Sequence, residues 1–379
     1  MTDPRSHRSL RIASHPDRNP GNPYIDLLYG ALARYGIDHA GRMVADRFWL
    51  EGAGRDVNAV HIHWPERIWR GKRVGRFDRA LALISGRSIR GVLRLCRFLN
   101  AAGARGVTRL WTVHNLAHHE GASAVDRWGY RELARRSDLL ICFSNAAAQE
   151  LRSTYGPNTP ILVVSHGSYK GAYPPPRPCA ETRAALALRD DRPLVSCLGL
   201  LRPYKGIELA CDAVQTLAGR VQLLIAGQPH RSFNVEGLLA RAAASRGTIV
   251  AIPRALTDAE FSNAVAASDA VVLPYHAVTG SGVLFAAWTL GAGVIASDLP
   301  FFREMLSGDP LRGRTFRVGD SADLAGAIEG YLAVPRDKRR GALAAIADEL
   351  SPEHVVRPLV DFLYSRSEGG ERVHDAVRS

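Results

Sequence analysis

The chain has 379 residues, 46% of them apolar, which suffices for two or three packed domains and excludes disorder as its dominant state. Its five cysteines form no C-x-x-C pair, so neither a disulfide scaffold nor a zinc module is expected. The 49 basic and 37 acidic residues leave a net charge of +12, which favours phosphates, nucleic acid or anionic lipid as partners.

The basic residues concentrate between residues 67 and 109, where twelve Lys or Arg accompany a single acid, Asp78. Apolar residues are interleaved at helical spacing, and each Lys or Arg near an anionic leaflet contributes roughly 1 kcal/mol to binding. The region predicts peripheral attachment to the inner face of the cell membrane, with an ordinary solvated basic helix as the alternative. No zinc spacing or RNP-like aromatic string is present, so nucleic acid is not expected as a partner.

The start of the chain is polar, and no apolar run approaches the ~18 residues that span a bilayer. We therefore expect a cytoplasmic protein with neither a secretory signal nor a membrane-spanning segment.

In the first half, short apolar runs alternate with helical patterns, which is typical of a doubly wound parallel sheet. A proline-rich stretch then interrupts the alternation at residues 171–178 and predicts an interdomain linker. The expected strands cover residues 10–14, 59–63, 110–114, 139–144 and 161–164.

The second half restarts the same alternation and predicts a second parallel sheet. Ligands bind beyond the carboxyl ends of such strands, so two facing sheets predict one interdomain cleft. The expected strands cover residues 194–198, 222–226, 249–252, 270–273 and 293–296. The predicted domains are residues 1–172 and 185–350, joined by a linker at 173–184.

The loop after the strand at 194–198 combines a glycine with two cations. Gly199 ends the strand, and Arg202 and Lys205 stand three residues apart just before a helix. A diphosphate needs close backbone approach and two cations, so this loop predicts a diphosphate site. The alternative is a loop of ordinary surface charges.

A second anion-binding element is predicted at residues 274–283, between a buried strand and a helix that starts near Val283. Ser281 is a natural N-cap, and the amides of Gly282 and Val283 would face a phosphate with the helix dipole behind them. Both loops follow strands of one sheet, so we expect them to bind one ligand together.

These motifs resemble the carboxyl-terminal half of GT-B glycosyltransferases, most closely glycosyltransferase family 4 and divergent bacterial polysaccharide mannosyltransferases. The resemblance combines G-x-x-x-x-x-K-G at 199–206, A-G at 226–227, the S-G helix start and G-x-x-V-I-A-S at 291–297. It is strong over residues 194–305. In the first half it is weak, through Trp111-Thr112-Val113-His114-Asn115 and His166-Gly167.

The resemblance implies two facing Rossmann-like domains of the GT-B fold, with a C-terminal helix in residues 351–379 crossing back to the first domain. That helix is expected to kink at Pro358. The resemblance also implies a nucleotide-sugar donor, a GDP-sugar or UDP-sugar, as co-substrate, with no cofactor and no metal.

Several donor-binding residues follow from the resemblance. Arg202 and Lys205 would hold the diphosphate, and Arg254, between Pro253 and Ala255, would lie beside the base. The family usually carries two glutamates eight positions apart, where Val278 and Ala286 stand here, so their contacts must come from elsewhere and the stereochemistry stays open. The implied donor set is Gly199, Arg202, Lys205, Arg254, Tyr275, Thr279, Gly280, Ser281, Gly282 and Val283.

The predicted function is therefore hexosyl transfer, with GDP-mannose as the donor suggested by the resemblance. The acceptor would be a lipid-linked or saccharide molecule in bacterial polysaccharide or glycolipid synthesis. The alternatives are a sugar-nucleotide epimerase or phosphorylase of the same fold, and a non-catalytic protein that binds membrane or nucleic acid through its basic surface.

The first domain should bind the acceptor and, in an inverting reaction, supply a base. The predicted catalytic residues are His114, His15 and Asp17, with His114 first because Asn115 follows it at the end of a buried strand. A structural role is the alternative for each histidine, and a metal is not expected because no Asp-x-Asp pair is present. Further candidates are His61, His63 and Glu120.

Overall fold

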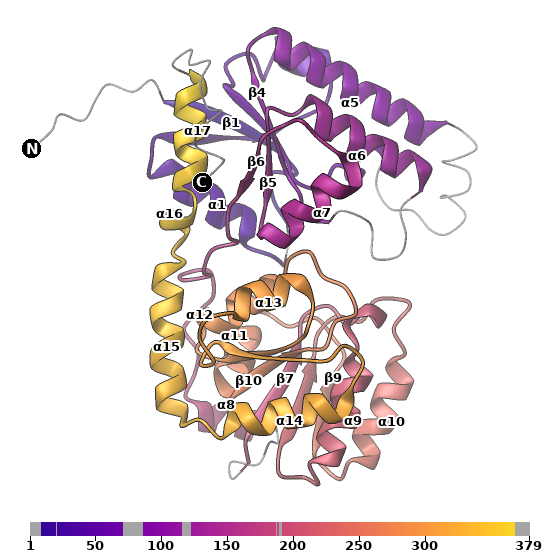
Figure 1. The fold of residues 1–379 in the computed structure, drawn as a ribbon, viewed down its shortest axis with the longest axis vertical. Helices are drawn as coiled ribbons and strands as arrows, with labels where there is room; N and C mark the ends of the chain where they lie inside the picture. Colours follow the sequence, from indigo (N-terminus) through magenta and orange to yellow (C-terminus); the bar gives the residue numbers. More distant parts are fainter. Residues whose placement is uncertain are drawn as a thin grey trace, which may run out of the picture. The chain divides into compact units, whose positions relative to one another are not determined.

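The computed structural model describes residues 9–367, except residues 20, 71–85, 116–122, 187 and 189–191. The chain divides into two compact units (Figure 1). The first unit comprises the residues up to Ser165 and those from Pro352 onward, and the second comprises His166–Ser351. Within the described ranges, no helix has the length and apolar character needed to cross a bilayer.

The first unit contains a six-stranded sheet, all of whose strand pairs are parallel, in the order β2-β1-β3-β4-β5-β6. The order reverses between β1 and β3, which makes this the switch point where such sheets bind ligands. The strands are β1 (Leu10–His15), β2 (Ile37–Arg42), β3 (Ala59–Ile62), β4 (Thr108–Thr112), β5 (Leu139–Cys142) and β6 (Ile161–Val163).

The main core of the first unit lies on one face of this sheet. Val60 and Ile62 of β3 join Trp111 of β4 in a buried cluster with α5 and α6. Alternate residues of a strand point to opposite faces, so His61 lies on the other face, toward α1. The helices are α1 (Tyr24–Ala33), α2 (Arg47–Glu51), α3 (Glu66–Arg70), α5 (Arg87–Ala104), α6 (Ala124–Arg136), α7 (Asn145–Tyr155), α16 (Pro352–Val355) and α17 (Arg357–Ser367).

The second unit contains a six-stranded parallel sheet in the order β12-β11-β10-β7-β8-β9. Its order reverses between β7 and β10, whose carboxyl ends carry the two predicted anion-binding loops. The strands are β7 (Leu194–Leu198), β8 (Gln222–Ala226), β9 (Ile249–Ile252), β10 (Ala270–Leu273), β11 (Gly293–Ser297) and β12 (Gly313–Phe316).

Helices follow most strands of the second sheet, and buried residues of α9 and α14 pack with β7 and β8 in one core. A capping box of Thr257 and Glu260 starts α11. The helices are α8 (Cys179–Ala185), the short 3-10 helix η1 (Pro203–Lys205), α9 (Ile207–Thr216), α10 (Val235–Ala244), α11 (Asp258–Ala267), α12 (Gly282–Thr289), α13 (Pro300–Leu306), α14 (Ser321–Leu332) and α15 (Arg336–Glu349).

Two edge strands, β2 and β12, were not predicted from the sequence. β2 pairs only with β1, and four of its six residues lie in the sequence Asp38-His39-Ala40-Gly41, which has no apolar run. β12 is a four-residue strand that pairs only with β11. An edge strand is partly solvated, so its sequence lacks the apolar pattern of a central strand.

The boundaries near the proline-rich stretch and the C-terminus also differ from expectation. Residues 173–184 belong to the second unit, and α8 begins within them at Cys179. The last helical segment breaks at Val356, between α16 and α17, rather than at Pro358. Pro358 instead lies in the first turn of α17, where its missing N–H costs no helical hydrogen bond.

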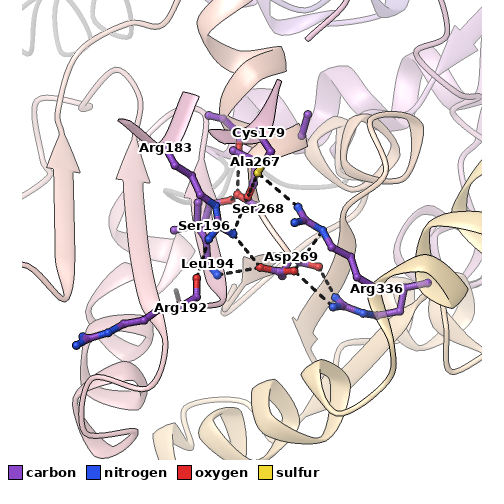
Figure 2. Close-up of polar contacts among 12 residues, drawn as sticks. Cys179, Arg183, Arg192, Leu194, Ser196, Ala267, Ser268, Asp269 and Arg336 are labelled. Atoms are coloured by element: carbon purple, nitrogen blue, oxygen red, sulfur yellow. Dashed lines mark hydrogen bonds and ion pairs between the residues drawn. The ribbon is translucent and has the colours of Figure 1, made fainter. Parts of the chain in front are cut away.

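A buried carboxylate joins the amino ends of β7 and β10 (Figure 2). Asp269 Oδ2 accepts hydrogen bonds from Leu194 N at 3.0 Å and from Arg183 Nη2 of α8 at 3.1 Å. Arg336 and Arg339 of α15 approach Oδ1, each at 3.5 Å. One side chain thereby ties two central strands to two helices.

Replacing Asp269 with alanine is expected to lower the free energy of unfolding of the second unit by about 3–5 kcal/mol, because buried arginines lose their counterion. Urea denaturation measures this loss. The matched control is Asp298→Ala, which removes a half-buried carboxylate paired with the exposed Arg303 at 2.8 Å and should cost no more than about 1 kcal/mol. Equal losses in the two variants would contradict the assignment of Asp269 as the central tie.

Candidate functional site

The two predicted anion-binding loops of the second unit lie against each other. Gly199 has a φ of +92°, and a Cβ placed on it would lie 3.5 Å from Val283 Cγ2 and 3.8 Å from Lys205 Nζ. The amide of His276 donates to the carbonyl oxygen of Tyr204 at 2.8 Å. The structure therefore brings the first turn of α12 and the ammonium of Lys205 to the same glycine at the switch point.

Lys205 is a buried cation without a carboxylate partner in the described part of the chain. Its side chain is only 8% exposed, and its Nζ lies 5.2 Å from the centroid of the Tyr275 ring. Burial, followed by the neighbouring charge of Arg202, lowers the pKa of Lys205 to about 8. Arg202 is half-buried and also forms no ion pair there, so two adjacent positive charges lack an anion.

The helix tip itself differs in one detail from expectation. Ser281 does occupy the N-cap position of α12, but its side chain makes no capping hydrogen bond. The first amides of the helix therefore have no side-chain acceptor from the N-cap, and with the helix dipole they favour an anion. Thr279 and Gly280 lie half-buried in the loop that precedes this tip.

Two residues outside the predicted donor set, His166 and Tyr169, border the N-terminus of α12. A Cβ on Gly282 would lie 2.6 Å from the hydroxyl of Tyr169 and 3.8 Å from His166, so only glycine leaves room for these rings. His166 stacks on Tyr169 with centroids 5.4 Å apart and on Phe285 at 5.3 Å. In the sequence, His166 was indicated only by the His166-Gly167 pair, and no pattern indicated Tyr169.

Arg254 is not joined to this cluster. It is exposed, and its two Nη atoms bind the carboxylate of Glu260 at 2.7 and 3.0 Å. The pKa of Glu260 is lowered to about 2, chiefly by the hydrogen bond from Arg254. The guanidinium thus binds the glutamate of the α11 capping box, six residues further along the chain. The prediction that Arg254 lies beside the nucleotide base did not include this ion pair.

A hydrogen-bonded chain of side chains, here named the histidine relay, lies at the carboxyl ends of β3 and β4 in the first unit. Thr112 Oγ1 lies 2.7 Å from His61 Nε2, and His61 Nδ1 lies 3.0 Å from the hydroxyl of Tyr29. The same hydroxyl lies 3.0 Å from His63 Nε2. His63 Nδ1 in turn lies 3.2 Å from Nε2 of His114, which ends the relay.

His114 is the half-buried end of the relay, whereas Thr112, His61 and His63 are at most 1% exposed. The His114 ring stacks on Trp64 with centroids 4.0 Å apart. His61 and His63 therefore lie in the interior of the unit rather than at an accessible strand end, which makes them unsuited to contact a substrate.

His15 and Asp17 lie near the relay at the end of β1. Burial, opposed in part by a hydrogen bond to the backbone of Met43, lowers the pKa of His15 to about 4. The Nε2 atom of His15 is buried without a hydrogen-bond partner among the described residues. Burial also lowers the pKa of His39, and the charge of Asp17 offsets part of the lowering at both histidines. Glu120 lies outside the described residues.

In the described part of the chain, no group of three or more His, Cys, Asp or Glu side chains is placed to hold a metal ion. A cavity of the second unit between α9 and α10, lined by Glu208, Cys211 and Arg241, contains none of the predicted site residues. The cavity lined by Lys205 and Tyr275 lies instead at the ends of β7 and β10.

Comparisons with known proteins match both units to one class of enzyme. Residues 192–333 match the family model described as "Glycosyl transferases group 1", and residues 85–168 match that of "Glycosyltransferase Family 4". Together these models span more than half of the chain.

Curated relatives are a quarter to a third identical to this chain over the residues that align. A GDP-mannose:glycolipid 4-beta-D-mannosyltransferase of Xanthomonas campestris is 26% identical over 279 residues, covering 73% of this chain and 69% of the relative. A D-inositol 3-phosphate glycosyltransferase of Gordonia bronchialis is 30% identical over 290 residues, covering 69% and 61%.

Solved structures resemble the whole fold. A sucrose-phosphate synthase of Thermosynechococcus elongatus superposes with a TM-score of 0.68 at 17% identity, covering 95% of this chain and all of the other. Anabaena HepE in complex with UDP gives a TM-score of 0.66 at 17% identity, covering 94% and 100%. The chain therefore belongs to the group 1 and family 4 glycosyltransferases, a class of transferase enzymes, and its two parallel sheets are those of the GT-B fold.

Proposed function

We propose that this enzyme transfers a hexose from a nucleoside diphosphate sugar to a saccharide or lipid-linked acceptor in the synthesis of a bacterial polysaccharide or glycolipid. The observation that carries the proposal is the pair of unneutralised cations, Lys205 and Arg202, beside the tip of α12 at the switch point of the second sheet. GDP-mannose is the proposed donor, since the relative from Xanthomonas campestris is named as a GDP-mannose-dependent mannosyltransferase.

The second unit would stabilise the leaving group. When the bond between the anomeric carbon and the diphosphate breaks, negative charge develops on the diphosphate oxygens. Lys205, Arg202 and the amides of Gly282 and Val283 would stabilise that charge. The mechanism is thus electrostatic stabilisation by fixed groups, with Tyr275 supporting the ammonium through its ring.

The ribose and the sugar of the donor must be bound without the two glutamates that the family usually carries. Val278 and Ala286 occupy the positions of the family's two glutamates, and Ala286 is buried. We assign the ribose and sugar contacts to polar groups around the tip, namely the loop at Thr279 and Gly280 and the hydroxyl of Tyr169 beside Gly282.

The first unit would bind the acceptor and activate its hydroxyl. An inverting transfer needs a base within hydrogen-bond reach of that hydroxyl. His114 is the proposed base, because it is the half-buried end of an otherwise buried polar chain. His15 is the second candidate, and Asp17 would assist it through its charge.

The exposed face of α5 supports peripheral attachment to the inner face of the cell membrane from a cytoplasmic enzyme. Ile89 is 45% exposed and Leu93 is 39% exposed, four residues apart on the helix. Arg90, Arg94 and Arg97 flank them on the exposed side, and α5 contains no acid. Apolar side chains with arginines around them suit an anionic leaflet.

Not all basic residues between 67 and 109 are available for this contact. The carboxylate of Asp126 binds Arg70, and that of Asp138 binds Arg109 at 2.8 Å. These two arginines hold the unit together. Within the described residues, we therefore assign the proposed membrane contact to α5. Residues 71–85, which the predicted basic region also includes, lie outside the described residues.

Donor binding depends on the charge of Lys205, so Lys205→Met is expected to weaken GDP binding by about 2 kcal/mol, roughly thirtyfold. Thermal shift measures it, since GDP at 100 times its dissociation constant stabilises the wild type by about 2.7 kcal/mol. Because the pKa of Lys205 is lowered to about 8, GDP affinity should fall as the pH rises past that value. Lys338→Met, on the exposed side of α15, is the control.

The same assay compares GDP with UDP, and a larger shift with GDP supports GDP-mannose as the donor. Unchanged GDP binding in Lys205→Met would overturn the proposed diphosphate site.

Turnover separates sugar transfer from epimerisation and phosphorolysis. The wild type should release GDP from GDP-mannose only when an acceptor is present. His114→Gln should lower kcat by about 10²- to 10⁴-fold while the affinity for GDP stays the same, because a general base acts on the acceptor and not on the diphosphate. Unaltered kcat in His114→Gln would move the base to His15.

Membrane attachment is tested with vesicles of phosphatidylglycerol and phosphatidylcholine. Arg90→Gln with Arg94→Gln should weaken co-sedimentation by about 2 kcal/mol, because each arginine near the leaflet contributes roughly 1 kcal/mol. The matched control is Arg131→Gln with Arg135→Gln, the same charge change at the same spacing on exposed positions of α6. Equal weakening by both pairs would argue against a specific role for α5.

A further inference from the structure

The ends of three neighbouring strands meet around His15 in the first unit. The amide of Met43, which follows β2, donates to the carbonyl oxygen of Ser14 at 2.8 Å. The amide of His63, which follows β3, donates to the carbonyl oxygen of His15 at 2.9 Å. The last residue of β1 therefore lies between the ends of β2 and β3, at the switch point of the first sheet, where a ligand is expected.

Two arginines from different elements act on the His15 ring. Arg42 is the last residue of β2, and Arg67 lies in α3. Burial is the main cause of the lowered pKa of His15, and the positive charges of Arg42 and Arg67 lower it further. The negative charge of Asp17 raises this pKa, but by less than either arginine lowers it. The charged neighbours of His15 thus produce a net positive potential at the ring.

This positive potential is local to His15. His39 lies on the adjacent strand, β2, and burial is again the main cause of its lowered pKa. At His39, however, the charges of Asp17 and Asp26 each have a larger effect on the pKa than the charge of Arg18. An anion is therefore favoured beside His15 rather than beside His39.

In the described part of the chain, neither Arg42 nor Arg67 is neutralised by an ion pair. Arg42 is exposed and has no carboxylate within reach there. Arg67 is also exposed, and its guanidinium contacts neutral groups, namely Asn19 Oδ1 at 3.3 Å and the Trp64 ring at 5.1 Å. These contacts hold the Arg67 guanidinium against the loop that follows β1 without cancelling its charge.

A buried ring nitrogen is the third polar group at this point. Nε2 of His15 has no hydrogen-bond partner among the described residues. A buried polar atom without a partner is unfavourable, so its presence indicates a bound ligand or water. An anion beside the ring favours the imidazolium form, whose Nε2–H donates to that anion.

The number of donor groups suits a phosphate better than a carboxylate. A guanidinium binds an anion through two parallel N–H groups, which together occupy two oxygens. A carboxylate has two oxygens, and one arginine can occupy both. A phosphate or diphosphate has enough oxygens for two arginines and an imidazolium at the same time.

We propose that Arg42, Arg67 and His15 form a binding site for a phosphate group of the acceptor. The inference rests on the proposed function, in which the first unit binds the acceptor. It adds the chemical class of that acceptor, a saccharide or lipid that carries a phosphate or diphosphate. The phosphate anchors the acceptor at the end of β1, and His114 remains the proposed base for its hydroxyl.

The test follows the His15 ring itself, because pyrophosphate is also expected to bind the proposed donor site of the second unit. NMR of histidine labelled with ¹³C at Cε1 gives one signal for each ring, and the signal that His15→Gln removes belongs to His15. Inorganic pyrophosphate should shift this signal in the wild-type protein. It should also raise the pKa of His15 above its ligand-free value of about 4, because an adjacent anion stabilises the imidazolium. An unchanged signal and pKa overturn the proposal.

Arg42→Gln with Arg67→Gln should weaken the binding of pyrophosphate at His15 at least about tenfold, because the charge-assisted hydrogen bonds to the phosphate are lost. Each single variant should show part of this loss and serves if the double variant does not fold. The matched control is Arg131→Gln with Arg135→Gln, the same charge change on exposed positions of α6. Equal weakening by the two pairs would reveal a general effect of net charge and overturn the proposal.

Two further probes distinguish the source of the phosphate. Glucose 6-phosphate represents a soluble sugar phosphate, and farnesyl diphosphate represents a lipid-linked diphosphate. The probe of the correct class should shift the His15 signal at the lower concentration, and Arg42→Gln with Arg67→Gln should raise that concentration. If neither probe moves the signal, the proposal is wrong.

Binding at His15 and sugar transfer are measured separately, so the inference and the proposed function can fail independently. Absence of transfer from any nucleoside diphosphate sugar would defeat the function, whatever pyrophosphate does at His15. A His15 ring that responds to no phosphate would defeat the inference even in an enzyme that transfers mannose.

Discussion

The two ends of β7 and β10 differ in whether their charged side chains are neutralised, and this difference sets the anion-binding character of the second unit. At the amino ends, Asp269 neutralises arginines from α8 and α15 and accepts a backbone hydrogen bond from β7. At the carboxyl ends, Lys205 and Arg202 have no carboxylate in the described residues. A site that keeps two close positive charges unneutralised is destabilised until an anion arrives, so binding an anion relieves a strain that the fold itself maintains.

In the first unit, the histidine relay contains buried histidines that are neutral, rather than unneutralised cations. Thr112, His61, Tyr29 and His63 are buried and hydrogen-bonded to one another, and this chain ends at the half-buried His114. Burial prevents His61 and His63 from becoming cations. The proposed diphosphate site and the proposed base thus have electrostatic environments of different kinds.

Much of the second unit could be predicted because its signals are local. Gly199, Arg202 and Lys205 follow an apolar strand directly, and their loop does lie against the first turn of α12. The ion pair of Arg254 with Glu260 could not be read from the sequence, because many charged residues are equally close along the chain. The edge strand β2 was missed because one side of it is unpaired and its residues are mostly polar.

The first unit was predictable in outline but not in its central contact. His114 was expected at the end of a buried strand, and the structure places it at the end of β4. The connection through Tyr29 joins residues more than thirty positions apart on a helix and a strand, and both residue types are common in apolar interiors. Such pairings depend on how α1 packs on the sheet, which periodicity alone does not specify.

The first unit combines two segments that are far apart in the sequence, and α16 and α17 form the second of them. Tyr364 of α17 donates its hydroxyl proton to the carbonyl of Tyr35 at 2.6 Å, and Tyr35 donates to the carbonyl of Glu353 at 2.9 Å. A ribosome makes these partners more than three hundred residues apart, with the whole second unit between them. The folding of the segment around α1 must therefore wait for the later-made α16 and α17, and a nascent chain carries an uncovered surface beside α1 until these two helices have been translated.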